Sequence, residues 1–212
     1  MRTPLVLALA LPLVACTTET SSESVQAASS EPHASSAPPA MDETSPTTEP
    51  AVEPTSGFYA LDASPLDDVP ADLGEYAGQV TLVVNVASRC GYTRQYAGLQ
   101  ELHTELEGRG FAVLAFPSNE FGGQEPGSPA EIREFCTSEF GVSFPMFAKC
   151  EVKPGAGQSP VYGFLQQETG EVPGWNFCKY LIGRDGQVIG FYESSVAPDD
   201  AELRQAIETA LG

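Results

Sequence analysis

The chain has 212 residues and a formal net charge of −19, because 29 acidic side chains face only 10 basic ones. So acidic a chain is poorly suited to bind nucleic acid or the headgroups of anionic lipids. Residues 57–212 have the length and the apolar content of one domain with a core of its own.

The first residues predict export from the cytoplasm. Arg2 is followed by an apolar run over residues 5–15 and then by Cys16. Such a run is typical of a signal peptide and is shorter than a membrane-spanning helix requires. Its end, Leu13-Val14-Ala15-Cys16, resembles a bacterial lipobox, which implies a signal peptide over 1–15 and a lipid on Cys16. An ordinary signal peptide with an incidental cysteine is the alternative.

Residues 16–56 are predicted to form a lipidated, disordered tether. They consist largely of Ser, Thr, Pro, Ala and Glu. Because they have almost no large apolar side chains, they cannot bury enough surface to offset the entropy cost of ordering. Thr17 follows the cysteine, and by analogy with enteric lipoproteins this implies the periplasmic face of the outer membrane. We therefore expect the cell envelope as the location, with residues 57–212 held to the membrane through the lipid.

In residues 57–212, apolar segments with strand character alternate with segments of helical periodicity. Helix 128–139 has the clearest start, since Ser128-Pro129-Ala130-Glu131 combines a capping box with proline at the first helical position. Strands are expected at 80–86, 111–116, 142–147, 177–182 and 187–192, and the other helices at 93–108, 160–167 and 198–211. This order predicts an α/β thioredoxin-like fold, with a central mixed β-sheet and helices on both faces.

Cys90 lies between the strand over 80–86 and the helix expected from residue 93. Free N–H groups and the helix dipole favour an anion at such a position. A cysteine there gains thiolate character and becomes a nucleophile near neutral pH. For a lone cysteine, a buried structural role is the usual alternative. The position after a buried strand, with Gly91 next in the chain, favours the reactive role.

Five blocks of sequence together resemble the glutathione peroxidase family. They follow the family's order: NVASRCGYT at 85–93, FPSNEFGGQEPG at 116–127, FC at 135–136, FGVSFPMF at 140–147 and WNF at 175–177. The resemblance spans essentially all of residues 57–212. It implies an enzyme that reduces hydrogen peroxide and organic or lipid hydroperoxides without a metal or another cofactor, in defence against oxidative stress.

The resemblance also implies a catalytic set, in which Gln124, Trp175 and Asn176 join Cys90. Amide and indole N–H groups donate hydrogen bonds without titrating, so they can stabilise both a thiolate and a developing oxyanion. Taken singly, these three residues are explained as well by a turn, a core aromatic side chain and a second turn. Spacing along the sequence does not by itself bring them together.

Cys136 occupies the position of the second redox cysteine in the family's thioredoxin-dependent members. We therefore expect a Cys90–Cys136 disulfide during turnover and a thioredoxin-like protein as reductant, with local unwinding of helix 128–139. A buried helix cysteine is the alternative for Cys136. Glutathione is less expected as the reductant, since the acidic domain offers little to hold an anion. A redox relay or sensor that passes oxidation to a client protein would use the same residues.

Three further expectations concern the remaining features. The short stretch between Leu165 and Trp175 implies a monomer with an open site, because the oligomeric members of the family carry an insertion there. Cys150 and Cys178 either form a structural disulfide or remain as two free thiols. His103, on the helix expected over 93–108, is expected at the surface or at an interface.

Overall fold

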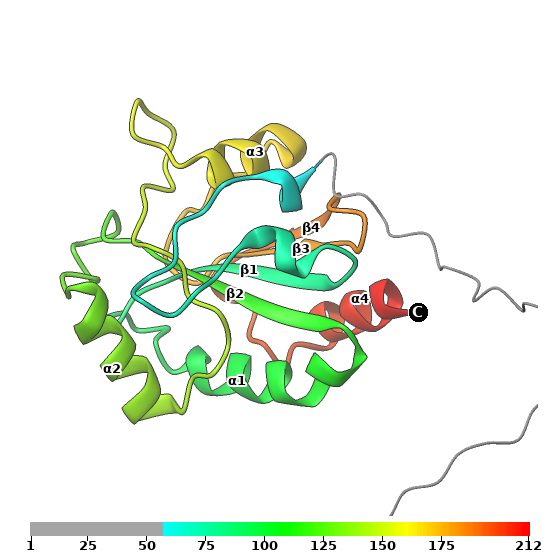
Figure 1. Cartoon of the computed structure of the whole chain (residues 1–212), viewed down its shortest axis with the longest axis horizontal. Coiled ribbons are helices and arrows are strands. Elements are labelled where there is room, and N and C mark those ends of the chain that lie inside the picture. Colours follow the sequence, from blue (N-terminus) through cyan, green and yellow to red (C-terminus); the bar gives the residue numbers. More distant parts are fainter. Residues whose placement is uncertain (1–56) are drawn as a thin grey trace, which may run out of the picture. The chain divides into compact units, whose positions relative to one another are not determined.

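The computed structural model describes residues 57–212, so the predicted signal peptide (1–15) and tether (16–56) lie outside the described residues. The described residues fold around a four-stranded sheet with the order β2-β1-β3-β4 (Figure 1). The strands are β1 (Val80–Val86), β2 (Phe111–Pro117), β3 (Lys179–Ile182) and β4 (Val188–Tyr192). β1 pairs with β2 in parallel and with β3 antiparallel, and β3 and β4 form a hairpin. The predicted mixed sheet is confirmed.

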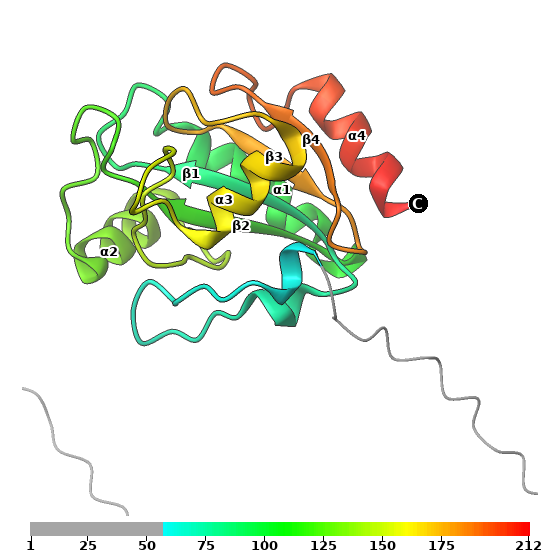
Figure 2. The same cartoon turned by 90° about the horizontal axis from the view of Figure 1, so that it is seen from above.

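Helices cover both faces of this sheet (Figures 1 and 2). In residues 57–212 the α-helices are α1 (Gln95–Leu106), α2 (Pro129–Phe140), α3 (Pro160–Thr169) and α4 (Ala201–Leu211). One face packs against α1, α2 and α4, and the other against α3 and two short 3-10 turns, Phe58–Ala60 and Leu73–Tyr76. A third 3-10 turn, Glu107–Arg109, extends α1. None of the helices in this part of the chain is long and apolar enough to cross a membrane.

β1 is buried along its whole length because helices cover both of its faces. Val84 and Val86 pack toward α1 and α4, whereas Val83 packs toward α3. Alternate side chains of a strand point to opposite faces, so a strand covered on both sides requires an unbroken apolar run. The run over residues 80–86 largely meets this requirement, with Thr81 and Asn85 as its two buried polar residues.

The strand expected over 142–147 is wrong. Met146 and Phe147 form only single bridges, one with β2 and one with Pro65. Ala115 of β2 donates its N–H to the carbonyl of Pro145 at 3.0 Å and accepts from the N–H of Phe147 at 2.9 Å. Pro145 itself has no N–H to continue a ladder, so the pairing stops after one bridge.

His103 is buried rather than exposed, which corrects the expectation of a surface position. Its Nδ1 accepts a hydrogen bond from the N–H of Val113 at 3.4 Å, and its ring packs edge-on against Phe144. Burial lowers the pKa of His103, which favours the neutral ring. The residue is therefore part of the packing between α1 and β2.

The predicted capping box at the start of α2 is confirmed and can be tested by substitution. Glu131 donates its N–H to Ser128 Oγ at 3.4 Å, and Ser128 donates its N–H to Glu131 Oε2 at 2.8 Å. We expect Ser128→Ala to lower the free energy of unfolding by about 1 kcal/mol, because the first turn loses this cap. Urea denaturation followed by circular dichroism measures the change.

Ser138→Ala is the matched control within the same helix. Ser138 donates only to the carbonyl of Glu134, four residues earlier, and alanine is the better helix former at such a position. We expect its free energy of unfolding to stay within about 0.5 kcal/mol of the parent protein. Equal losses for the two variants would contradict the capping role of Ser128.

Candidate active site

Cys90 lies in a turn between β1 and α1, and the turn is held by Thr93. The N–H of Cys90 donates to Thr93 Oγ1 at 2.9 Å, and the Thr93 hydroxyl donates to the carbonyl of Ala87 at 2.8 Å. The N–H of Tyr92 points to the Cys90 sulfur, with 3.4 Å between nitrogen and Sγ. The Cys90 sulfur therefore has one backbone N–H as a hydrogen-bond donor.

Cys90 lies between β1 and α1 as expected, but the source of its donor needs a correction. α1 begins at Gln95, after turns over residues 91–94, so its free N–H groups lie beyond the cysteine. The amide that reaches Sγ belongs to Tyr92 in the preceding turn. A backbone amide was predicted as the donor, and this is what the structure has. The amide belongs, however, to the turn that Thr93 closes and not to the helix.

Gln124 and Asn176 meet beside this turn. Asn176 Nδ2 donates to Gln124 Oε1 at 3.0 Å, and the N–H of Arg89 donates to the carbonyl of Gln124 at 3.0 Å. Gln124 is therefore bonded both to the residue before Cys90 and to the segment that precedes β3. Since its oxygen accepts from Asn176, its amide nitrogen is left to donate, and it has no acceptor within residues 57–212.

Trp175 completes the group of predicted residues. This residue is 40% exposed, and its ring lies at 5.7 Å, centroid to centroid, from the ring of Phe121. Gly122 separates it from Gln124: a Cβ at this glycine would lie 3.6 Å from Gln124 Cγ and 3.8 Å from the Trp175 ring. Gly122 also has a φ of 67°, in the left-handed region that favours glycine. The structure thus places Gln124, Trp175 and Asn176 together, next to the turn of Cys90.

Asn85 is a site residue to which the sequence analysis gave no role. It is fully buried near the end of β1, and its Nδ2 donates to the carbonyl of Trp175 at 2.9 Å. Its own carbonyl accepts from the N–H of Phe177 at 2.6 Å. Phe177 has a φ of 68°, which is unusual for a residue with a side chain and shows how tightly the segment is constrained. The signal in the sequence was an amide side chain inside a largely apolar strand.

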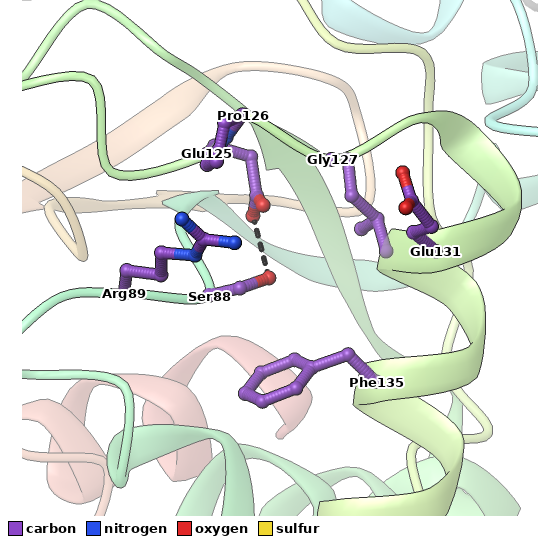
Figure 3. Close-up of a pocket in the computed structure, with 8 residues that line it drawn as sticks. Ser88, Arg89, Glu125, Pro126, Gly127, Glu131 and Phe135 are labelled. Carbon is purple, nitrogen blue, oxygen red and sulfur yellow. Dashed lines mark hydrogen bonds between the residues drawn. The ribbon is translucent and has the colours of Figure 1, made fainter.

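A pocket of about 290 Å³ lies between the turn of Cys90 and α2 (Figure 3). Glu125 is fully buried there and accepts a hydrogen bond from Ser88 Oγ at 3.1 Å. Its second carboxyl oxygen has no partner among the described residues, and burial raises the pKa of Glu125. Arg89 and Phe135, which precede Cys90 and Cys136 in the chain, also line the pocket. It therefore separates the segments that carry the two predicted redox cysteines.

Comparison with known proteins decides the family. The family model described as glutathione peroxidase matches residues 58–166. The chain belongs to the glutathione peroxidase family. It is 43% identical to a hydroperoxy fatty acid reductase of Synechocystis sp., over 73% of this chain and 95% of the relative. It is 44% identical to a glutathione peroxidase-like peroxiredoxin of Schizosaccharomyces pombe, over 74% of this chain and 99% of the relative.

Solved structures agree with this assignment. The crystal structure of T. cruzi GPX1 has a TM-score of 0.58 and 31% identity, and the match covers 74% of this chain and 97% of that one. A thioredoxin-family thiol:disulfide interchange protein from Chlorobium tepidum has a TM-score of 0.50 and 16% identity, with 72% and 99% covered. The second likeness concerns the fold alone. The predicted thioredoxin-like fold is confirmed.

Cys136 of this glutathione peroxidase family member is fully buried on α2. It belongs to the same apolar cluster as Cys90 and Tyr96. Burial raises the pKa of the Cys136 thiol to about 11. Both Cys90 and Cys136 are free thiols in this structure. With α2 intact, Cys136 is thus a protonated side chain that water does not reach, and its resolving role stays a prediction.

Cys150 and Cys178 are also free thiols, so the structure contains no disulfide between them. Cys178 lies 3.3 Å from the hydroxyl of Ser194, sulfur to oxygen. Cys150 lines a separate cavity of about 210 Å³ together with Phe147 and Ser159, and burial raises its pKa to about 11. In residues 57–212 no three His, Cys, Asp or Glu side chains are arranged to hold a metal ion.

The different environments of the thiols predict different rates of alkylation. In the reduced protein at pH 7.5, we expect iodoacetamide to modify Cys90 first, because its sulfur faces a backbone donor. Cys136 and Cys150 should react more slowly by at least about tenfold, since thiols with a pKa near 11 are almost fully protonated at this pH. Peptide mass spectrometry over a time course measures the rate at each cysteine.

The same protein unfolded in urea is the control. Unfolding removes the burial that raises the pKa values, so we expect all the cysteines to react at similar rates there. If Cys136 reacts as fast as Cys90 in the folded protein, the buried, protonated state described for Cys136 is wrong.

Proposed function

We propose that this member of the glutathione peroxidase family is a thiol peroxidase that reduces hydroperoxides through Cys90. The observation that carries the proposal is the meeting of Gln124, Trp175 and Asn176 beside the turn of Cys90. Their N–H groups do not titrate in the ordinary pH range, so the donors persist at any pH at which the thiolate is present. The name of the Synechocystis relative, a hydroperoxy fatty acid reductase, supports the same class of substrate.

In the first step, the Cys90 thiolate attacks the terminal oxygen of the hydroperoxide. An S–O bond forms while the O–O bond breaks, so sulfur is oxidised to a sulfenic acid and the peroxide is reduced to an alkoxide. The alkoxide takes up a proton and leaves as the alcohol, or as water when hydrogen peroxide is the substrate. The amide of Gln124 and the indole N–H of Trp175 are suited to stabilise the negative charge on the departing oxygen.

In the second step, Cys136 attacks the sulfenic acid. The S–S bond forms, the S–O bond breaks, and the hydroxyl group leaves as water with the proton of the Cys136 thiol. Cys136 is buried within α2, and its carbonyl accepts from the N–H of Val142 at 3.1 Å, so the end of this helix has to open before the sulfurs can approach. A thioredoxin-like protein then reduces the disulfide by exchange.

The proposed reductant follows from charge and from the second cysteine. Glutathione carries a net negative charge, and the chain has 29 acidic side chains against 10 basic ones. A protein reductant needs only an accessible disulfide, which the opening of α2 would supply. The name of the Schizosaccharomyces pombe relative, a glutathione peroxidase-like peroxiredoxin, supports a peroxiredoxin-like activity.

We also propose that the enzyme is a lipoprotein of the bacterial envelope. The support lies in residues outside the described part of the chain: an apolar run that ends at Leu13-Val14-Ala15-Cys16, followed by a segment poor in large apolar side chains. A lipid on Cys16 would keep the peroxidase near membrane lipids, which are the source of bulky hydroperoxides.

Peroxide consumption by variants with one substitution each tests the catalytic cycle. We expect Cys90→Ser to abolish activity, because the nucleophile is lost. Gln124→Ala should lower the rate of Cys90 oxidation by about 10²-fold, since one oxyanion donor is lost. Cys136→Ser should still reduce one equivalent of peroxide but should lose turnover with thioredoxin. Stopped-flow and coupled assays with hydrogen peroxide and a fatty-acid hydroperoxide measure these rates.

Cys150→Ser is the control, and it should turn over like the parent protein. Sustained turnover of Cys136→Ser with thioredoxin would contradict the resolving role. Reduction of a single equivalent by the parent protein, with no turnover by thioredoxin or glutathione, would instead favour a redox relay. Absence of any reaction between Cys90 and either peroxide would contradict the peroxidase proposal itself.

Substitution of Cys16 tests the anchor separately. Expressed in a Gram-negative host, the full chain should enter the detergent phase of a Triton X-114 partition, and its N-terminal peptide should carry the mass of the added lipid. Cys16→Ala should lose both properties, because it lacks the sulfur that receives the lipid. Cys150→Ser should retain both. If the parent protein remains in the aqueous phase with an unmodified N-terminus, the lipoprotein proposal is wrong.

A further inference from the structure

Lys179, at the start of β3, is a fully buried cation without a carboxylate partner among the described residues. Its Nζ donates to two backbone carbonyls, that of Phe177 at 2.7 Å and that of Val196 at 2.6 Å. Burial lowers the pKa of the Lys179 ammonium to about 8. A buried ammonium is costly when only neutral dipoles compensate for the lost water, so this position calls for an explanation other than stability.

The carbonyl of Phe177, the first acceptor of Lys179, belongs to the segment that carries two of the predicted donors, Trp175 and Asn176. Phe177 directly follows Asn176 and has the unusual φ of 68°. From the side of β1, Asn85 binds this segment twice, at the carbonyl of Trp175 and at the N–H of Phe177. The remaining backbone group of Phe177, its carbonyl, is bound by Lys179. Asn85 and Lys179 thus hold residues 175–177 from two neighbouring strands.

The carbonyl of Val196, the second acceptor of Lys179, belongs to a segment that packs against α1. Gln95, the first residue of α1, donates its Nε2 to the carbonyl of Ser194 at 2.7 Å. Further along, Pro198 packs so closely on the helix that a Cβ added at Gly98 would lie only 3.2 Å from it. The segment around Val196 is therefore fixed to the helix that follows the turn of Cys90.

We propose that Lys179 is a positioning residue, whose ammonium ties the Phe177 carbonyl to the Val196 carbonyl and so fixes Trp175 and Asn176 relative to the turn of Cys90. The inference rests on the proposed function for what the site does. The position of Trp175 can nevertheless be measured without any turnover. Lys179 acts on the backbone of the donor segment, so it has no direct contact with the peroxide in this proposal.

Lys179→Met tests the proposal, because methionine fills a similar volume but cannot donate to either carbonyl. The chain contains a single tryptophan, Trp175, so tryptophan fluorescence reports on the site alone. In the reduced full chain we expect stronger acrylamide quenching and lower anisotropy of Trp175. We also expect Cys90 oxidation by hydrogen peroxide to slow by about 10- to 100-fold, as misplaced catalytic groups do. The urea midpoint is measured alongside, because the removal of a buried charge and the loss of a donor to two carbonyls change it in opposite directions.

Arg184→Met is the matched control. Arg184 also donates to backbone carbonyls, those of Gly78, Arg109 and Leu211, but it follows β3 at the end of the sheet away from Cys90. We expect this variant to change the urea midpoint while Trp175 quenching, anisotropy and the rate of Cys90 oxidation stay at the parent values. The positioning role is supported if Trp175 fluorescence and the rate of Cys90 oxidation change in Lys179→Met and stay at the parent values in Arg184→Met.

Parent-like fluorescence and a parent-like oxidation rate in Lys179→Met would overturn the proposal, as would equal effects on Trp175 in both variants. Where Lys179→Met fails to fold by circular dichroism, Lys179→Gln replaces it, since its shorter amide cannot span the two carbonyls, and the same readouts decide. If the parent protein does not react with peroxide, the proposed function fails. The response of Trp175 then still decides the role of Lys179.

Discussion

The site depends on how the last residues of β1 bind the loops around them. Asn85 binds the backbone on both sides of Asn176, and Arg89, four residues later, binds the carbonyl of Gln124. A strand buried on both faces offers a rigid base for these bonds, because packing fixes its position from above and below. The side-chain bond from Asn176 to Gln124 then joins two loops that this strand already holds. The proposed donors are thus arranged before any substrate arrives, as electrostatic stabilisation of an oxyanion requires.

The two predicted redox cysteines differ in environment, and the difference imposes an order on the proposed cycle. The Cys90 sulfur faces a backbone N–H, whereas burial keeps Cys136 protonated with a pKa of about 11. A Cys136 that was already an accessible thiolate would compete with Cys90 for peroxide. Its burial in α2 prevents this, and resolution has to wait until the helix opens. The pocket between the turn of Cys90 and α2 leaves unfilled space beside both segments, so less packing is lost when they move.

Local signals in the sequence were sufficient for most elements but not for the site. The run over 80–86 and the cap at Ser128 each contain their own physical cause, and both were predicted correctly. The strand over 142–147 failed because Pro145 limits pairing to single bridges, which apolar composition does not reveal. The resemblance to the family grouped Gln124, Trp175 and Asn176, since contacts between residues more than 50 positions apart leave no periodic pattern. For Lys179 the sequence pattern predicts only a place in a strand, because such a pattern does not show to which carbonyls a side chain will donate.

The basic side chains of residues 57–212 differ in the partners that they bind. Within residues 57–212, three arginines pair with carboxylates: Arg109, Arg133 and Arg204. Four other cations donate to backbone carbonyls: Lys149, Lys153, Lys179 and Arg184. The two basic side chains of this part of the chain that do neither are Arg89 and Arg94, which flank Cys90 in the sequence and are both exposed.

Glu125, the buried acid of the pocket, accepts a hydrogen bond from Ser88 rather than from Arg89. Its raised pKa reduces its own negative charge. Arg89 and Arg94, the two basic side chains that form no internal hydrogen bond or ion pair within residues 57–212, are thus exposed on either side of Cys90 in the sequence.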